Sequence, residues 1–242
     1  MSMKMSFSSR YGRGLEVIAI LKSKQDYNST RPEESLVNFQ NFLESIHVIN
    51  NTVTQNEEDT KVLTDARHAL FNEGQGSVMR TFTALKSNVG WQYGFESTEY
   101  KLLDIIWNRM ISSGIVSNAT GEQTITEEPQ DSEVKKSRKN SERTFSAMSK
   151  NFEDFIVTIS GFQNYNPGPD KFKLENLNAT LTTINDFNTQ IADKKLKLDV
   201  IKKQRLSLYS ELKDRTDRIK SNIRSQYGVD SDVFIRTNSL KF

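Results

Sequence analysis

Residues 86–97 read KSNVGWQYGFES, and residues 220–231 read KSNIRSQYGVDS. The two segments share Lys-Ser-Asn, Gln-Tyr-Gly and the final serine, and the Val/Ile and Glu/Asp differences between them are conservative. A shared pattern of this length predicts an internal duplication of the chain.

The correspondence continues upstream at an offset of 138 residues, which becomes 134 near Gly74. The matched pairs include Phe7 with Phe145, Tyr27 with Tyr165, Leu43 with Leu181, Asn50 with Asn188, and Arg67 with Arg205. We therefore predict a first helical copy over residues 1–110 and a second over residues 142–242. Residues 111–141 are rich in Ser, Thr and charge, which is typical of a flexible linker.

A long helix is expected in each copy, because apolar residues recur every three or four positions. In the second copy these are Leu174, Leu177, Leu181, Ile184 and Ile191, with Asn188 in the same series. Residues 170–226 contain no glycine or proline. Residues 54–61 and 192–199 are polar enough for either a continuous helix or a hairpin. Continuation is favoured because neither stretch holds a helix breaker.

The ends of the expected helices are marked by glycine, proline and capping residues. Thr30 and Glu33 have the capping-box spacing at the start of the first long helix. The first long helix should end at Gly74, and a shorter helix should end at Gly94, with Gly228 as the matching cap. A short tail then packs back. The predicted fold is all-α, an elongated helical bundle made from two tandem copies of a helix–long helix–short helix unit.

The Asn50 and Asn188 side chains sit at the same position of the two apolar series. One interpretation is a polar device that fixes helix register. The other is that both asparagines face solvent, and the sequence alone does not separate the two.

Catalytic and metal sites are not indicated by the composition. The chain has 242 residues, a net charge of +2, no cysteine and two histidines, His47 and His68, without metal-ligand spacing. The Gly74-Gln75-Gly76 stretch lacks the lysine and strand of a phosphate loop. We therefore expect a non-enzymatic protein with no cofactor and no metal.

The apolar run at residues 17–21 is too short for a signal peptide or a membrane span. We therefore expect no transmembrane segment and a cytoplasmic protein.

A basic run in the second copy suggests contact with nucleic acid or with an acidic partner. Its candidate contact residues are Lys194, Lys195, Lys197, Lys202, Lys203, Arg205, Lys213 and Arg218. The alternative is a solvated helix face. Residues 57–59, Glu-Glu-Asp, occupy the matching part of the first copy, so the two charged stretches also have the signs to attract each other.

Aromatic residues gather at the end of the first copy, and they are Trp91, Tyr93, Phe95, Tyr100 and Trp107. They are candidates either for core packing or for a patch that binds a protein partner.

Residues 165–177, YNPGPDKFKLENL, and residues 226–242, QYGVDSDVFIRTNSLKF, resemble a group of uncharacterised tandem-repeat helical proteins from Bacteroidota bacteria. The resemblance covers the second copy well and the first copy weakly. It implies a Tyr-Asn-Pro start before a long helix and a closing segment near Leu-Lys-Phe. No known activity accompanies it.

Three functions are consistent with these observations. The leading hypothesis is a helical scaffold or protein-interaction module whose partner is protein, either a second copy or another chain. The first alternative is nucleic-acid binding through the basic residues 194–224. The second is a membrane-active helical protein, which rests only on residues 17–21 and the aromatic cluster.

The duplication predicts that the two copies stabilise each other. Residues 1–110 and residues 142–242, produced separately, should each be less stable than the intact chain, because seam leucines lose their partner. At least one fragment should self-associate, and cleavage near Pro129 should leave the halves together. Thermal melts and sedimentation of the fragments check this. A fragment that melts as a monomer at the temperature of the whole protein contradicts it.

Overall fold

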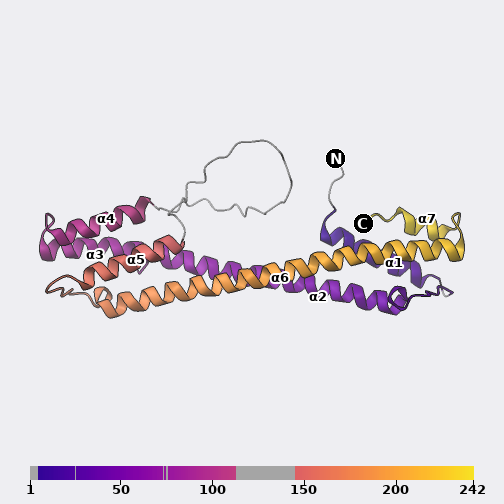
Figure 1. Cartoon of the computed structure of the whole chain (residues 1–242), viewed down its shortest axis with the longest axis horizontal. Helices are drawn as coiled ribbons and strands as arrows, with labels where there is room; N and C mark the ends of the chain where they lie inside the picture. Colours follow the sequence, from indigo (N-terminus) through magenta and orange to yellow (C-terminus); the bar gives the residue numbers. More distant parts are fainter. Residues whose placement is uncertain (1–4, 25, 73, 75, 113–144) are drawn as a thin grey trace, which may run out of the picture. The chain divides into compact units, whose positions relative to one another are not determined.

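The computed structural model describes residues 5–24, 26–72, 74, 76–112 and 145–242. These residues contain α-helices and two short 3-10 helices, with no strand among them (Figure 1). The α-helices are α1 (Phe7–Lys22), α2 (Leu36–Asn72), α3 (Val78–Tyr93), α4 (Thr98–Ser112), α5 (Phe145–Ser160), α6 (Leu174–Tyr227) and α7 (Asp232–Ser239). The predicted all-α class is confirmed. Most of the predicted linker, from residue 113 onward, lies outside the described residues.

The long helices α2 and α6 are uninterrupted over 37 and 54 residues. The prediction of continuation through residues 54–61 and 192–199 is therefore confirmed, and the hairpin alternative is wrong. The helix α2 ends at Asn72, before Gly74, whose φ is 76°. The helix α6 meets no glycine at the matching place, so the expected long and short helices of the second copy form one helix.

Glycine ends both α3 and α6, as the sequence predicts. Gly94 and Gly228 have φ angles of 97° and 82°, and their N–H groups donate to the carbonyls of Gly90 and Arg224 at 3.0 Å. Beyond them the expected short tail is helical, because serine side chains cap α4 and α7. The Oγ of Ser97 accepts from the Tyr100 N–H at 3.1 Å, and that of Ser231 accepts from the Phe234 N–H at 3.3 Å.

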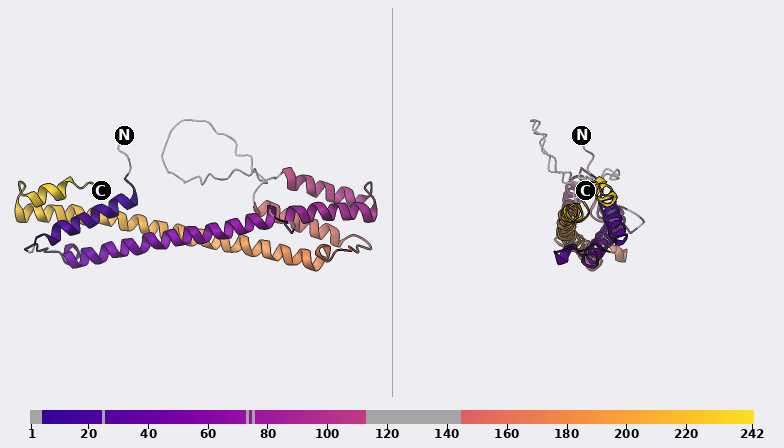
Figure 2. Two further views of the ribbon diagram at one scale, coloured as in Figure 1. Left: turned by 180° about the vertical axis from the view of Figure 1, so that it is seen from behind. Right: turned by 90° about the vertical axis from the view of Figure 1, so that its right-hand side faces the viewer.

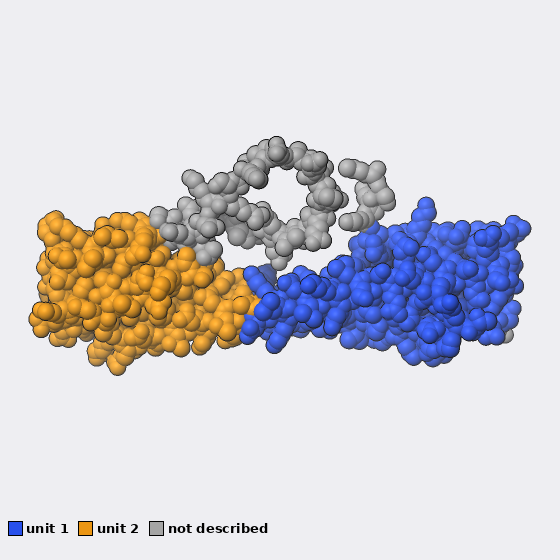
Figure 3. Space-filling view, viewed as in Figure 1, with its two compact units in different colours: residues 1–61, 193–242 blue, residues 62–192 orange. Residues whose placement is uncertain are grey.

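The chain divides into two compact units, coloured separately in Figure 3. Unit 1 is Met1–Lys61 with Asp193–Phe242, and unit 2 is Val62–Ala192. Both divisions fall inside helices, one in α2 and one in α6. Each unit therefore contains parts of both predicted copies, so the compact units differ from the sequence segments 1–110 and 142–242.

In unit 1, α1 packs against the first part of α2 and the second part of α6, and it also contacts α7. The buried core is Val17, Ile18, Ile20, Leu21, Phe39, Phe42, Leu43, Ile46, Tyr209, Leu212, Ile219, Ile223 and Val233. Each side chain of this size contributes about 1.5–3 kcal/mol when it is fully buried. The core thus joins residues that are far apart in the sequence.

In unit 2, α3 and α4 lie side by side as a hairpin, and α5 packs against α4 (Figures 1 and 2). The rings of Phe82 and Phe155 stack with centroids 3.7 Å apart, and Trp107 lies 5.2 Å from Phe82. The first part of α6 closes this core with Leu177 and Ile184, both buried.

Several internal contacts of unit 1 have a counterpart in unit 2 at the offset seen in the sequence. The Tyr27 hydroxyl donates to the Glu34 carbonyl at 3.1 Å, and the Tyr165 hydroxyl donates to the Phe172 carbonyl at 2.7 Å. Two cation–π pairs also match. They are Arg205 over Phe7 at 4.4 Å and Arg67 over Phe145 at 4.1 Å. An internal duplication would produce such pairs, and the duplication itself stays a prediction.

The asparagines of the two apolar series are hydrogen-bonded inside their units. The Asn50 amide donates to the Tyr209 hydroxyl at 2.9 Å. The Asn188 amide donates to Ser149 at 2.9 Å and its oxygen accepts from Arg67 at 2.9 Å. These bonds support the interpretation as a polar register device rather than as solvent-facing residues.

The Phe82–Phe155 stack predicts the cost of opening the unit 2 core. Phe82 is 0% exposed, so Phe82→Ala should lower the free energy of unfolding by about 3–5 kcal/mol. Denaturant unfolding of the full chain measures this. The control is Leu102→Ala, since Leu102 is 43% exposed in the same unit. Equal losses for the two variants would contradict the assigned core.

Candidate functional site

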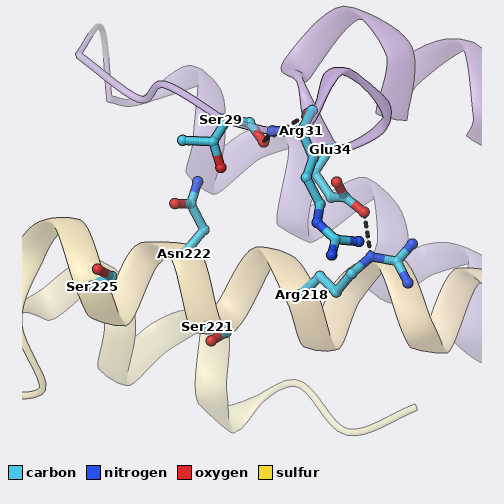
Figure 4. Close-up of a pocket in the computed structure, with 8 residues that line it drawn as sticks. Ser29, Arg31, Glu34, Arg218, Ser221, Asn222 and Ser225 are labelled. Carbon is cyan, nitrogen blue, oxygen red and sulfur yellow. Dashed lines mark hydrogen bonds and ion pairs between the residues drawn. The ribbon is translucent and has the colours of Figure 1, made fainter.

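A cavity of about 310 Å³ lies in unit 1 between the loop after α1 and the last turns of α6 (Figure 4). It is lined by Ser29, Thr30, Arg31, Glu34, Arg218, Ser221, Asn222 and Ser225. All eight side chains are polar. Pockets for drug-sized molecules are mostly apolar, so this lining suits a small hydrophilic ligand instead.

The α6 side of the cavity is one face of the helix. Arg218, Ser221, Asn222 and Ser225 are spaced by three and four residues, which places them on one face. Figure 4 shows them on the α6 ribbon below the loop. Core residues such as Ile219 and Ile223 occupy another face and are fully buried. The burial of the apolar face therefore fixes the polar face toward the loop.

The loop side of the cavity is fixed by short-range hydrogen bonds. The Ser29 hydroxyl accepts from the Arg31 N–H at 3.2 Å and donates to the Arg31 carbonyl at 2.8 Å. The Asn222 amide donates to the Asn28 carbonyl at 3.1 Å, which ties the loop to α6. A 3-10 turn, η1 (Pro32–Glu34), then separates the loop from α2.

The expected capping box at Thr30 and Glu33 is wrong, because η1 intervenes and α2 begins only at Leu36. Ser35 takes the capping role instead, since its Oγ accepts from the Asn38 N–H at 3.4 Å.

An ion pair between a buried carboxylate and a partly exposed arginine forms the wall of the cavity. Glu34 is 2% exposed, and its Oε1 accepts a hydrogen bond from the Nε of Arg218. This bond raises the pKa of Arg218 above its ordinary value. The second carboxylate oxygen of Glu34 is buried and has no hydrogen-bond partner in the described part of the chain. A buried oxygen that accepts no hydrogen bond lowers the stability of the folded state. A purely structural role therefore explains this ion pair poorly.

Four other lining side chains are exposed to solvent, and their polar groups make no hydrogen bond within the described structure. They are the guanidinium of Arg31 and the hydroxyls of Thr30, Ser221 and Ser225. Threonines elsewhere on α6 donate to the carbonyl four residues earlier, as Thr180 and Thr216 do at 3.0 and 2.8 Å. Ser221 and Ser225 have no such bond there, so their hydroxyls are available to a ligand.

Of the eight positions in unit 2 that match this cavity by sequence offset, three are apolar, and Ser87 and Asn88 repeat Ser221 and Asn222 of unit 1. Phe172 stands where unit 1 has Glu34, Ala84 where it has Arg218, and Trp91 where it has Ser225. Phe172 is 4% exposed and belongs to the unit 2 core. A hydrophobic pair of similar volume is often as stabilising as a buried ion pair, or more so. Stability alone therefore gives no reason for the charged pair in unit 1.

Most of the predicted basic residues of α6 have internal partners. The Nζ of Lys194 lies 2.7 Å from Asp59, and that of Lys202 lies 2.8 Å from Glu57. These are pairs between the two oppositely charged stretches noted in the sequence. Within α6, Lys213 pairs with Asp217 at 3.0 Å. Arg205 covers the ring of Phe7, and Arg218 binds Glu34.

Three of the predicted basic residues, Lys195, Lys197 and Lys203, are exposed on α6.

The ion pair between Lys194 and Asp59 also affects the carboxylate. The hydrogen bond from Lys194 holds the pKa of Asp59 below its ordinary value, so the carboxylate stays charged and keeps neutralising the lysine.

The predicted aromatic residues of unit 2 fall into two groups. Tyr93 and Trp107 are packed, Tyr93 with its hydroxyl 2.9 Å from the Gln163 carbonyl and Trp107 against Phe82. Trp91 and Phe95 are 82% and 60% exposed. Phe95 meets the ring of Tyr100 edge-on at 5.2 Å. Tyr93 and Trp107 therefore fit the interpretation as core packing, and Trp91 and Phe95 fit the interpretation as a patch that binds a protein partner.

His47 and His68 lie beside aromatic rings, those of Tyr11 and Phe145. Among the described residues, no group of three or more His, Asp or Glu side chains is placed to hold a metal ion. Within the same residues, no helix combines the length and apolar character that crossing a membrane requires.

Of the residues that line this cavity, the basic run in the sequence includes Arg218, while Arg31, Glu34, Ser221 and Ser225 belong to no predicted site. A signal in the sequence was present for Glu34. Glu34 and Arg218 are charged where the matching positions of the chain hold Phe172 and Ala84, so two charges replace an apolar pair together.

The Glu34–Arg218 ion pair predicts an unequal response to single and double substitution. Arg218→Ala should lower the free energy of unfolding by about 1–3 kcal/mol, because it removes the hydrogen-bond donor of the buried Glu34 carboxylate. Adding Glu34→Phe, which gives the residues of the matching unit 2 positions, should restore at least half of that loss. Denaturant unfolding of the three proteins decides. A double variant no more stable than Arg218→Ala would show that the buried charge is not the cause.

Comparison of the chain with protein-family models, with curated proteins and with solved structures finds no match in any of the three. The similarity to Bacteroidota helical proteins thus stays an expectation from the sequence.

Proposed function

We propose that this protein is a non-enzymatic helical protein-interaction module, and that Trp91 is its central contact residue. The observation that carries the proposal is the 82% exposure of Trp91 on the last turn of α3. The core-facing residues of α3, among them Phe82 and Val89, are 0% exposed. The apolar face of α3 is therefore buried in the core, and Trp91 projects from the helix into solvent.

An exposed tryptophan has a physical cost that binding removes. The indole is the largest side chain, and tryptophan is enriched among the residues that contribute most to protein–protein binding. Phe95, 60% exposed, follows Trp91 beyond the Gly94 turn and adds apolar surface. The expected partner is a protein that offers an apolar pocket to these two rings.

The hairpin that carries Trp91 is held in place before any partner binds. The Lys86 ammonium forms an ion pair with Asp104 of α4 and lies 5.1 Å from the ring of Tyr100. A Cβ on Gly90 would come within 2.5 Å of the Phe95 ring, so this glycine lets the ring sit against α3. A pre-organised surface loses less conformational entropy on binding.

Nucleic-acid binding through residues 194–224 has weaker support. Carboxylates of α2 already neutralise Lys194 and Lys202, and phosphate contact would have to replace those pairs. The proposal therefore stays with protein binding.

Substitution at Trp91 tests the proposal. Trp91→Ala should remove the proteins that co-purify with the tagged full-length chain and should change the free energy of unfolding by less than about 0.5 kcal/mol. Val157→Ala is the control, because Val157 is 64% exposed in the same unit. Quantitative mass spectrometry compares the three preparations. Retention of every specific partner by Trp91→Ala would sink the proposal.

Fluorescence gives an independent readout, because the chain holds two tryptophans, Trp91 and Trp107. In a Trp107→Phe variant, the remaining indole should emit as a solvent-exposed group and shift to shorter wavelength when a captured partner is added. An emission maximum that does not move on saturation would place the partner elsewhere.

A further inference from the structure

The cavity of unit 1 presents solvent-exposed hydrogen-bond donors that have no acceptor in the described part of the chain. The Arg31 guanidinium and the hydroxyls of Thr30, Ser221 and Ser225 line it without a partner in the described chain. They come from two separate elements, the loop after α1 and the last turns of α6 (Figure 4). A guanidinium with nearby hydroxyls is the donor set that carboxylate and phosphate groups bind.

The charge of the lining has the matching sign. Arg31 and Arg218 carry two positive charges and Glu34 one negative charge, so the lining is positive by one unit. The Glu34 carboxylate is paired with Arg218, so these two charges neutralise each other. The positive charge of Arg31 has no negative partner among the lining residues. An anion would supply the missing charge.

The contrast with unit 2 at Glu34 and Arg218 argues that this ion pair serves a ligand rather than the fold. At the matching positions, the buried Phe172 and the partly buried Ala84 show that an apolar pair can stand at a related helix contact. In unit 1 the buried Glu34 instead fixes Arg218 at the cavity wall. Burying this carboxylate costs desolvation energy, and its position beside the cavity is consistent with a role in recognition.

We propose that this cavity binds a small oxyanion group, a phosphate or a carboxylate. Arg31 supplies the charged donor, and the hydroxyls of Thr30, Ser221 and Ser225 supply neutral donors. Glu34 neutralises Arg218 and holds it at the wall of the cavity. The volume of about 310 Å³ is at the lower end of the range for small-molecule sites, so the oxyanion can be part of a small polar molecule.

The test is a titration of the full-length protein with inorganic phosphate, and separately with acetate, at constant ionic strength. Nuclear magnetic resonance follows the Asn222 side-chain amide and the Arg31 Nε–H. Both signals should shift and saturate. The anion that saturates at lower concentration identifies the preferred group, tetrahedral or planar. Constant ionic strength removes general screening as the cause.

Variants separate a specific site from general attraction. Arg31→Ala should weaken binding by about tenfold or more, because a hydrogen bond to a charged group is lost. Arg236→Ala is the matched control, since it removes an exposed arginine of the same unit and should leave the affinity unchanged. A Ser221→Ala/Ser225→Ala variant should bind several-fold more weakly.

Three results would overturn the proposal. One is the lack of any saturable shift with either anion. Another is an equal loss of affinity in Arg31→Ala and Arg236→Ala, which would indicate non-specific attraction. The third is full affinity for the anion both in the Arg31→Ala variant and in the separate Ser221→Ala/Ser225→Ala variant. None of these outcomes bears on Trp91, which lies in the other unit, so the protein-interaction proposal is tested separately.

Discussion

The uninterrupted helix α6 is the constraint on which both cores depend. It has 54 residues, and at 1.5 Å per residue it is roughly 80 Å long, so it cannot fold back to bury its own apolar face. Its first part places Leu177 and Ile184 in the core of unit 2, and its second part places Leu212 and Ile219 in the core of unit 1. A break in this helix would separate residues that two different cores require.

The positions of the helices can be predicted from the sequence, but which helices pack against one another cannot. The absence of glycine and proline predicts continuity, and Gly94 and Gly228 predict helix ends, because these are local effects of backbone freedom. An apolar series identifies a buried face but not what covers it. The pairing of Phe7 with Arg205, and of Phe145 with Arg67, depends on contacts across more than 70 residues of chain, which periodicity does not report.

The candidate site shows the same division. Counting lysines and arginines on α6 overstates the free charge, because Asp59 and Glu57 approach from α2 and pair with Lys194 and Lys202. Arg31 and Glu34 belong to a loop and a 3-10 turn, where no periodic pattern marks a functional side chain. Only the fold brings them next to Arg218. The aromatic cluster was visible in the sequence, but the separation of exposed Trp91 from packed Trp107 needed the helix packing.

The central claim is that each compact unit joins the beginning of one half of the chain to the end of the other. Nuclear Overhauser contacts between aromatic rings of the monomeric protein test it most directly. The structure predicts a contact between Phe7 and Tyr209, whose centroids are 4.7 Å apart, and one between Phe71 and Phe145 at 5.3 Å. Contacts of Phe7 only with residues of α2 and α3, with none to Tyr209, would contradict the account.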